Sequence, residues 1–107
     1  MPRRRRFAIV FAPEILAHLD AIEQKDHRLI RQAIEEQLSF WSGQATRNRK
    51  PLEPPAPFGA TWELRFGPDN RFRVFYEVES GARVVHVLAV GIKERNQLRI
   101  GGEEFVP

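Results

Sequence analysis

The stretch WELRFGPDNRFRVFYEVESGARVVHVLAVGIK, from Trp62 to Lys93, decides the fold of this 107-residue chain. Apolar and polar residues alternate over residues 62–66 and again over 71–78, as they do in strands that bury one face. Ser80-Gly81 is a favourable two-residue hairpin turn, and a mostly apolar segment follows over residues 84–90. We therefore predict three consecutive antiparallel strands, with the third inside the sheet because it is apolar on both faces.

The apolar pattern also predicts the register of the first hairpin. A common buried face requires three pairs, Trp62 with Tyr76, Leu64 with Val74 and Phe66 with Phe72. On the other face, this register sets Arg65 directly opposite Arg73. Two like charges in that arrangement destabilise a sheet, so something should offset them. An anion bound by both guanidinium groups would do so, and so would a neighbouring carboxylate from Glu63 or Glu77.

The Ser80-Gly81 turn predicts the register of the second hairpin. On the face that carries the arginines, it pairs Phe75 with His86 and Arg73 with Leu88. Gly91 should end the third strand, and a short polar tail should follow it. The arginine face would therefore also carry His86, with the basic residues of the tail nearby.

The first half of the chain predicts a strand, two helices and a loop. Residues 7–11 form a short apolar strand, and apolar residues at helical spacing follow over 15–22, ending near Lys25. Asp26 is a suitable N-cap for a second helix, which Gly43 should stop. Residues 44–60 contain four prolines and no periodicity, as is typical of a loop.

We predict an α+β fold, in which the N-terminal strand and a helical hairpin pack on one face of a small, mainly antiparallel four-stranded sheet. The length suits one domain over residues 1–107. Residues 1–6 form a basic stub. For the tail over residues 100–107, the sequence leaves order and disorder open.

The composition excludes several classes of function. The chain has no cysteine, and its three histidines lack ligand spacing, so we expect neither a metal nor a cofactor. No apolar run approaches the ~20 residues that span a bilayer, and the N-terminus does not fit a signal peptide. We therefore expect no membrane partner and a cytoplasmic location. The net charge of +3 is compatible with nucleic acid, with an acidic protein or with neither.

Several segments in order resemble the RelE/ParE superfamily of bacterial toxins. They are FAPEILAHLDAI from Phe11, KPLEPP from Lys50, WELRF from Trp62, RFRVFYEV from Arg71 and VVHVLAVGIKER from Val84. The likeness extends from about Phe7 to Arg95. Each segment is weak alone, but their order and spacing are fairly specific for the superfamily.

The resemblance implies the toxin of a type II toxin–antitoxin pair, bound and restrained by a cognate antitoxin. We expect the activity of one branch, whose toxins inhibit translation by cutting mRNA on the ribosome as mRNA interferases. In the other they inhibit DNA gyrase by protein contact. A third possibility is a toxin that has lost catalysis and binds only its antitoxin.

The resemblance also assigns candidate site residues. Arg73 matches an arginine that stabilises the scissile phosphate, Arg65 matches a basic residue of the preceding strand, and Lys93 stands where the superfamily has arginine. Arg95 and Arg99 would anchor the RNA backbone.

Two positions depart from the superfamily's pattern. Glu63 replaces a basic residue, and the C-terminal tyrosine has no counterpart, because the only tyrosine, Tyr76, belongs to the core face. His86 could replace a lost acid or base, or it could be an ordinary strand residue.

The loop before the sheet carries the remaining candidates. Arg47, Arg49 and Lys50 form either an RNA-binding patch or a solvated loop.

Overall fold

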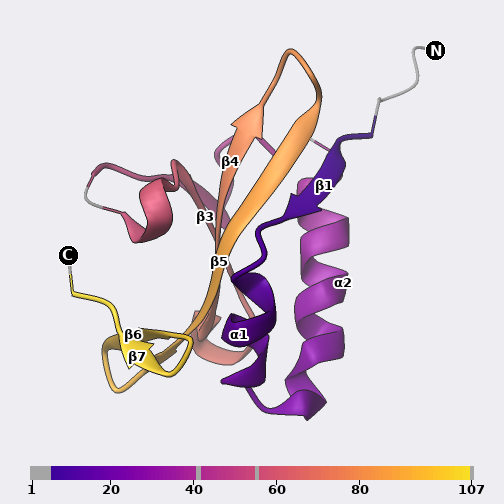
Figure 1. The fold of residues 1–107 in the computed structure, drawn as a ribbon. Helices are drawn as coiled ribbons and strands as arrows, with labels where there is room; N and C mark the ends of the chain where they lie inside the picture. Colours follow the sequence, from indigo (N-terminus) through magenta and orange to yellow (C-terminus); the bar gives the residue numbers. More distant parts are fainter. Residues whose placement is uncertain (1–5, 41, 55, 107) are drawn as a thin grey trace.

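A computed structural model describes residues 6–40, 42–54 and 56–106. The strands and helices in chain order are β1 (Ala8–Phe11), α1 (Ile15–Asp20), α2 (His27–Leu38), β2 (Arg49–Pro51), β3 (Trp62–Phe66), β4 (Phe72–Glu79), β5 (Val84–Glu94), β6 (Gln97–Ile100) and β7 (Glu103–Glu104). Short 3-10 helices are η1 (Gln24–Asp26), η2 (Pro57–Gly59) and η3 (Pro68–Asn70). Both α-helices lie on one side of the sheet, while η2 and the chain end lie on the other (Figure 1).

The sheet has seven strands in the order β2-β3-β4-β5-β6-β7, and β1 pairs with β5 in parallel. The prediction of a mainly antiparallel sheet under a helical hairpin is therefore confirmed, but the number of four strands is wrong. Arg49–Pro51, which we expected to be loop, pairs with β3. Residues 97–104, which we expected to be a polar tail, contain β6 and β7. β6 pairs with β5 in one hairpin, and β7 pairs with β6 in the next.

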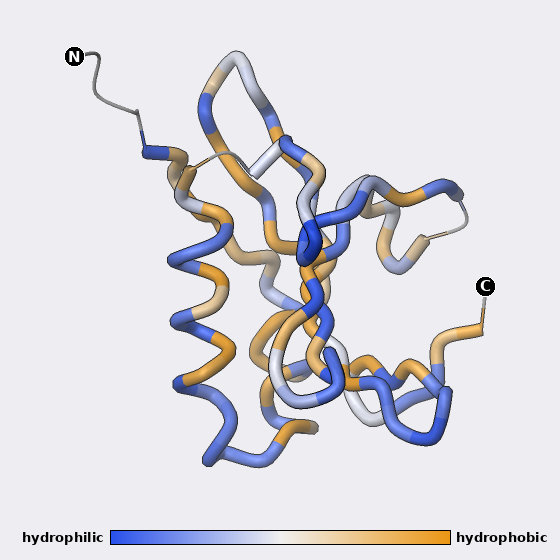
Figure 2. The backbone as a smooth tube through the Cα atoms, turned by 180° about the vertical axis from the view of Figure 1, so that it is seen from behind, coloured by the Kyte–Doolittle hydropathy of each residue, from blue (hydrophilic) through white to orange (hydrophobic). Residues whose placement is uncertain are grey.

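The helices cover one face of the sheet with an apolar stripe. Ile30, Ile34 and Leu38 of α2 are buried there at the expected spacing of three and four residues. Along α2, the apolar side faces the sheet and the polar side faces outward (Figure 2). The sheet contributes Leu64, Val74, Tyr76 and their neighbours on the same face, so this layer is the main core.

The β3–β4 hairpin has the predicted register throughout. Trp62 pairs with Tyr76, and Arg65 pairs with Arg73, around the five residues 67–71. Gly67 begins this turn with φ 81° and ψ 179°, a conformation that is essentially restricted to glycine. The sequence therefore determines this turn in two ways, through Gly67 and through the register of the flanking strands.

The predicted register of the β4–β5 hairpin is wrong. Its loop has four residues, 80–83, instead of two, and Tyr76 pairs with Val87 while Phe75 pairs with Ala89. Leu88 is therefore an extra residue, a β-bulge that reverses the side-chain alternation beyond it. Val85 and Val87 face the helices before the bulge, whereas Val90 does so after it.

A second apolar cluster lies on the face away from the helices. Phe75, Ala89 and Ile100 are buried there, and Leu98 and Phe105 pack against them from the C-terminal segment. Arg95 and Asn96 both have positive φ, as do Gly101 and Gly102, which fits two-residue turns in both terminal hairpins. Leu98 and Phe105 of this segment thus cover apolar side chains of β4 and β5.

His18 of α1 fills a gap along one edge of β5. β1 pairs with residues 84–87 of this strand and β6 with residues 91–94. Between them, the backbone N–H of Val90 donates to Nδ1 of His18 at 3.2 Å. Only 5% of His18 is exposed, and burial lowers the pKa of its imidazole below the usual 6.5, against the opposing effect of Glu14.

We expect the free energy of unfolding to fall as the pH drops below about 6.5. There the unfolded chain takes up a proton on His18 that the folded chain resists, because the protonated ring cannot accept the hydrogen bond from Val90. Urea unfolding at several pH values checks this. His18→Gln, whose amide oxygen can still accept the hydrogen bond from Val90, should flatten this dependence.

Candidate functional site

Arg65 and Arg73 meet on the face away from the helices, and a carboxylate lies between them. Glu63 Oε1 is 2.5 Å from Arg65 Nε, and Glu63 Oε2 is 3.4 Å from Arg73 Nη1. The side chains of Glu63 and Arg73 are 6% and 9% exposed, and that of Arg65 is 35% exposed. Of the two ways to offset the like charges, the carboxylate is the one present, so the pair by itself does not require an anion.

The turn between β3 and β4 holds Arg73 in one orientation. Its Nε donates to the carbonyl oxygen of Asn70 at 2.9 Å, while Nη1 bonds to Glu63. Two fixed contacts restrict a long side chain that would otherwise lose entropy on binding a ligand. Arg73 is therefore preorganised, although it is largely buried.

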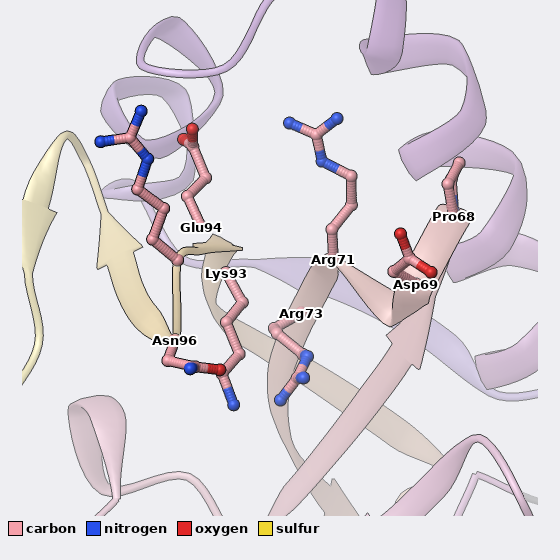
Figure 3. A pocket seen from close by; sticks show the side chains of 8 residues that line it. Pro68, Asp69, Arg71, Arg73, Lys93, Glu94 and Asn96 are labelled. Atoms are coloured by element: carbon pink, nitrogen blue, oxygen red, sulfur yellow. The ribbon is translucent and has the colours of Figure 1, made fainter.

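The bulge at Leu88 brings Lys93 to the same face as Arg73. Arg73 pairs with Gly91, and Lys93 lies two residues further along β5, so both point to one side of the sheet. Figure 3 shows Arg73, Lys93 and Asn96 on that side, with Arg71 and Glu94 pointing the other way. Without the extra residue, Lys93 would face the helices, so the irregularity places a cation in the site.

Gly91 allows β6 to lie close to this part of β5. A Cβ atom at this position would lie 2.8 Å from the carbonyl oxygen of Arg99 and 3.0 Å from Ile100 Cγ1. Any side chain here would push away the hairpin that carries Asn96. The glycine that we expected to end β5 instead permits the close packing of the next strand.

Two adjoining depressions on this face share Arg73, Lys93 and Asn96, and together they form what we term the outer groove. The cationic half has a volume of about 570 Å³, and Pro68, Asp69, Arg71, Glu94 and Arg95 complete its lining. The apolar half has a volume of about 290 Å³, and Leu52, Glu53, Ala56, Pro57, Glu63, Phe75, Leu98 and Phe105 complete its lining. Arg73 and Lys93 line both halves and point to the same side of the sheet (Figure 3), so the part of the groove that they share is suited to an anion.

Three other predicted residues lie on exposed parts of the chain. Arg95 lies in the β5–β6 turn and lines the cationic half. Lys50 pairs with Glu63 across β2 and β3, so it lies on the same face, outside the groove's lining. Arg47 is exposed just before β2. Lys50 and Arg95 could therefore extend a cationic surface beyond the groove.

The surroundings of Arg49 do not fit the predicted contact with RNA. Its Nη1 donates to the carbonyl oxygen of Gln37 at 2.6 Å, and its Nε donates to that of Gln44 at 3.2 Å. It thereby satisfies a carbonyl in the last turn of α2, a usual role for a basic residue at a helix C-terminus. Only 8% of Arg49 is exposed, so it is a structural residue.

Arg99 and His86 also lie away from the groove. Arg99 pairs with Ile92, which packs against the helix-side core, and its Nη2 bonds to Gln97 Oε1. His86 pairs with Glu77 across the strands, not with Phe75 as predicted, and its Nε2 lies 3.1 Å from Glu79 Oε2. Four residues of β5, 87–90, separate it from Gly91, which is opposite Arg73. The four-residue loop over residues 80–83 moves His86 by two positions from the predicted register.

Tyr76 cannot supply the missing tyrosine of the site. It is fully buried on the helix side, its hydroxyl donates to the carbonyl oxygen of Ser42 at 2.8 Å, and burial raises its pKa. Among the described residues, no group of three histidines or carboxylates is arranged to hold a metal ion. In the same part of the chain, no helix is long and apolar enough to cross a membrane.

Comparison with known proteins finds a similar structure but no similar sequence. No family model matches the chain, and no curated protein matches it. A chain from the crystal structure of the toxin–antitoxin complex RelBE2 of Mycobacterium tuberculosis is similar, with a TM-score of 0.66 and 18% identity. The match covers 86% of this chain and 97% of that one. The RelE-like fold expected from the sequence is therefore confirmed.

Proposed function

We propose that this protein is the toxin of a type II toxin–antitoxin pair and that it inhibits translation in the cytoplasm by cutting mRNA on the ribosome. The observation that carries the proposal is the outer groove, where Arg73 and Lys93 point to the same side of the sheet (Figure 3). The fold shared with a chain of a toxin–antitoxin complex supports the toxin role. The same likeness supports a cognate antitoxin as the partner.

In the proposed reaction, the 2′-oxygen of a ribose attacks the adjacent phosphorus and loses its proton. A 2′,3′-cyclic phosphate forms, and the 5′-oxygen of the next nucleotide leaves with a proton. Negative charge on the non-bridging oxygens rises in the transition state, and fixed cations stabilise it. Arg73, held by Glu63 and Asn70, and the more exposed Lys93 supply that charge.

The groove has fewer groups suited to proton transfer than to charge stabilisation. The described lining of the groove contains no histidine, and its buried carboxylate, Glu63, is occupied by two arginines. A groove that stabilises charge but lacks an obvious base fits a reaction in which the ribosome completes the site. We therefore expect that the protein does not cut RNA in the absence of ribosomes.

Induced expression in a bacterial host tests this proposal. We expect growth arrest within a few generations, and mapping of transcript 5′-ends should reveal new cuts inside translated regions. In a purified translation system, cuts should require ribosomes bound to the message. Intact messages during growth arrest would exclude the cleavage mechanism.

A second candidate, inhibition of DNA gyrase by protein contact, is favoured by one observation. Glu63 already neutralises much of the charge of Arg65 and Arg73, which weakens a catalytic role for that pair. A supercoiling assay with purified gyrase, run beside the translation assay, separates the two candidates. Inhibition of supercoiling without cuts in mRNA would favour the gyrase candidate.

A further inference from the structure

The His18 side chain contacts chain segments from both sides of the sheet. It belongs to α1, on the helix side, and its Nδ1 accepts the backbone N–H of Val90 at 3.2 Å. The centroid of its ring lies 5.3 Å from that of Phe58 in η2, which is on the other side of the sheet (Figure 1). A Cβ atom on Gly101, in the β6–β7 turn, would lie 3.5 Å from its Cδ2, so this turn also packs against it.

The backbone of Phe58 is strained where it meets His18. Its φ of 56° and ψ of 27° lie in the left-handed region, which is unusual for a bulky residue. Such conformations persist where surrounding contacts compensate for them. Phe58 is 54% exposed, and its ring pairs with that of His18 at a separation typical of aromatic pairs. We therefore interpret the His18 ring as the contact that holds η2 at the edge of β5.

The two segments that touch His18 also form walls of the apolar half of the outer groove. Pro57 of η2 lines one wall. Leu98 and Phe105, which lie before and after the β6–β7 turn, line the other. This segment is closed by a hydrogen bond, in which the N–H of Phe105 donates to the carbonyl oxygen of Leu98 at 2.8 Å. Displacement of His18 would therefore remove a contact from both walls.

We propose that His18 is a positioning residue: its neutral ring holds both walls of the groove in place, and RNA binding in the groove depends on it. The inference rests on the proposed function for its link to RNA, and it adds a residue outside the groove that controls the site. A protonated ring carries a hydrogen on Nδ1 and cannot accept from Val90. Both walls then loosen while the helix-side core stays packed.

The surroundings of His18 favour the neutral ring. Burial lowers its pKa below the usual 6.5, and Glu14, one turn earlier on α1, opposes this by raising the pKa. Residues 88–91 of β5, η2 and the β6–β7 turn contribute no titratable side chain, and the nearby Asp20 and Glu103 are exposed. When the walls open, the ring regains water and its ordinary pKa, so opening becomes easier as the pH falls below about 6.5.

Hydrogen exchange of single amides in the full-length protein, followed by NMR, tests the positioning role without RNA. The reporters are the N–H of Ala60, which donates to Pro57, and the N–H of Phe105. Their protection factors, which correct for the intrinsic effect of pH, should fall in the wild type by up to about tenfold between about pH 7.5 and about pH 5.5. In His18→Gln, which keeps an acceptor and does not titrate, both should stay constant.

Binding of a fluorescent trinucleotide with 2′-O-methyl riboses, which cannot be cleaved, tests the link to the groove. His18→Gln gives the baseline, because His27 and His86 titrate in both proteins. The two proteins should bind equally at about pH 7.5, and wild type should bind up to about tenfold more weakly than His18→Gln at about pH 5.5. A purely structural role of His18 would not produce this difference between the two pH profiles.

Phe58→Ala separates the two walls at neutral pH. Loss of the ring should lower the protection of Ala60 and leave that of Phe105 unchanged, because the C-terminal hairpin contacts His18 through Gly101. Leu16→Ala is the matched control, since Leu16 is 75% exposed on α1 and does not line the groove. Its protection factors should equal those of wild type.

Three results would overturn the positioning role. They are constant protection in the wild type, the same pH dependence in His18→Gln, and loss of the whole fold at the lower pH, which circular dichroism detects. Equal pH profiles of RNA binding in the two proteins would overturn the link to the groove. If protection changes as expected but RNA binds at neither pH, His18 still holds the walls and the proposed function fails.

Discussion

Arg73→Ala is expected to abolish growth arrest on induction and to lower ribosome-dependent cleavage by roughly 10²–10³-fold, the usual loss when one fixed donor to a developing oxyanion is removed. Arg73 is a cationic side chain of the groove that has two fixed contacts, to Glu63 and to Asn70. Cell growth after induction and the cleavage rate in a purified translation system are the measurements. The cleavage rate of Arg73→Lys should lie between those of wild type and Arg73→Ala, because lysine keeps the positive charge but lacks the planar guanidinium group.

Arg28→Ala provides the control for the change in net charge. Arg28 is exposed on α2, on the side of the sheet away from the groove, so its removal should leave toxicity unchanged. Glu63 keeps its contact with Arg65 in Arg73→Ala, so the fold should survive, and circular dichroism checks this. A folded Arg73→Ala variant that remains fully toxic would contradict the assigned site.

Gly67→Ala is expected to lower the free energy of unfolding by about 2–4 kcal/mol. The backbone at Gly67 has φ 81° and ψ 179°, and a Cβ atom would lie 2.5 Å from Cδ2 of Phe72. The substitution therefore adds backbone strain and a clash with a core ring. Urea unfolding is the measurement, and a loss of this size is a large part of the 5–15 kcal/mol typical of a domain.

Gly81→Ala is the matched control in the next hairpin loop. A Cβ atom there has no neighbour within 4 Å, and its φ is not in the positive range. We expect a change within about 0.5 kcal/mol. Equal midpoints for the two alanine variants would show that the turn before β4 relaxes without cost. The same turn carries the carbonyl of Asn70, so Gly67→Ala should also weaken the function of Arg73.

The register of the β3–β4 hairpin was predictable because the pattern of buried residues and the length of the turn both indicate the same pairing. Trp62, Leu64 and Phe66 must share a face with their partners on β4, and only one register leaves the turn GPDNR between them. A shift by one residue would expose the whole apolar set, so the register is strongly determined. The position of Arg65 opposite Arg73 followed directly.

The β4–β5 hairpin was not predictable in the same way. Residues 84–90 are apolar on both faces, so alternation does not determine which of them face the helices. Both faces are buried because a second apolar cluster covers the outer one. With no polar face to fix the register, neither the four-residue loop nor the bulge at Leu88 could be inferred, and His86 was placed beside Phe75 in error.

The terminal hairpins did carry a signal in the sequence. Gly101-Gly102 suits a two-residue turn, and Leu98, Ile100 and Phe105 are apolar residues that need a surface to cover. Charged residues of both signs interrupt the apolar residues of this segment, so we interpreted it as a polar tail. The consequence for the site is large, because Asn96, Leu98 and Phe105 all come from that segment.

The sequence limited the partner of Arg65 and Arg73 to a bound anion or a neighbouring carboxylate such as Glu63, but it did not decide between them. The register required an offset for two arginines, and either an anion or a carboxylate would serve. Side-chain geometry shows one oxygen of Glu63 on each guanidinium group. The case for an anion now depends on Arg73 together with Lys93, a pair that the bulge creates.

The most direct test of this account is the salt dependence of RNA binding by wild type, Arg73→Ala and Lys93→Ala, measured with an RNA that cannot be cleaved. If both cations contact phosphate, each substitution should weaken binding and reduce the slope of log affinity against log salt by about one. Arg28→Ala should keep the wild-type slope. Wild-type affinity and slope in both groove variants would contradict the account.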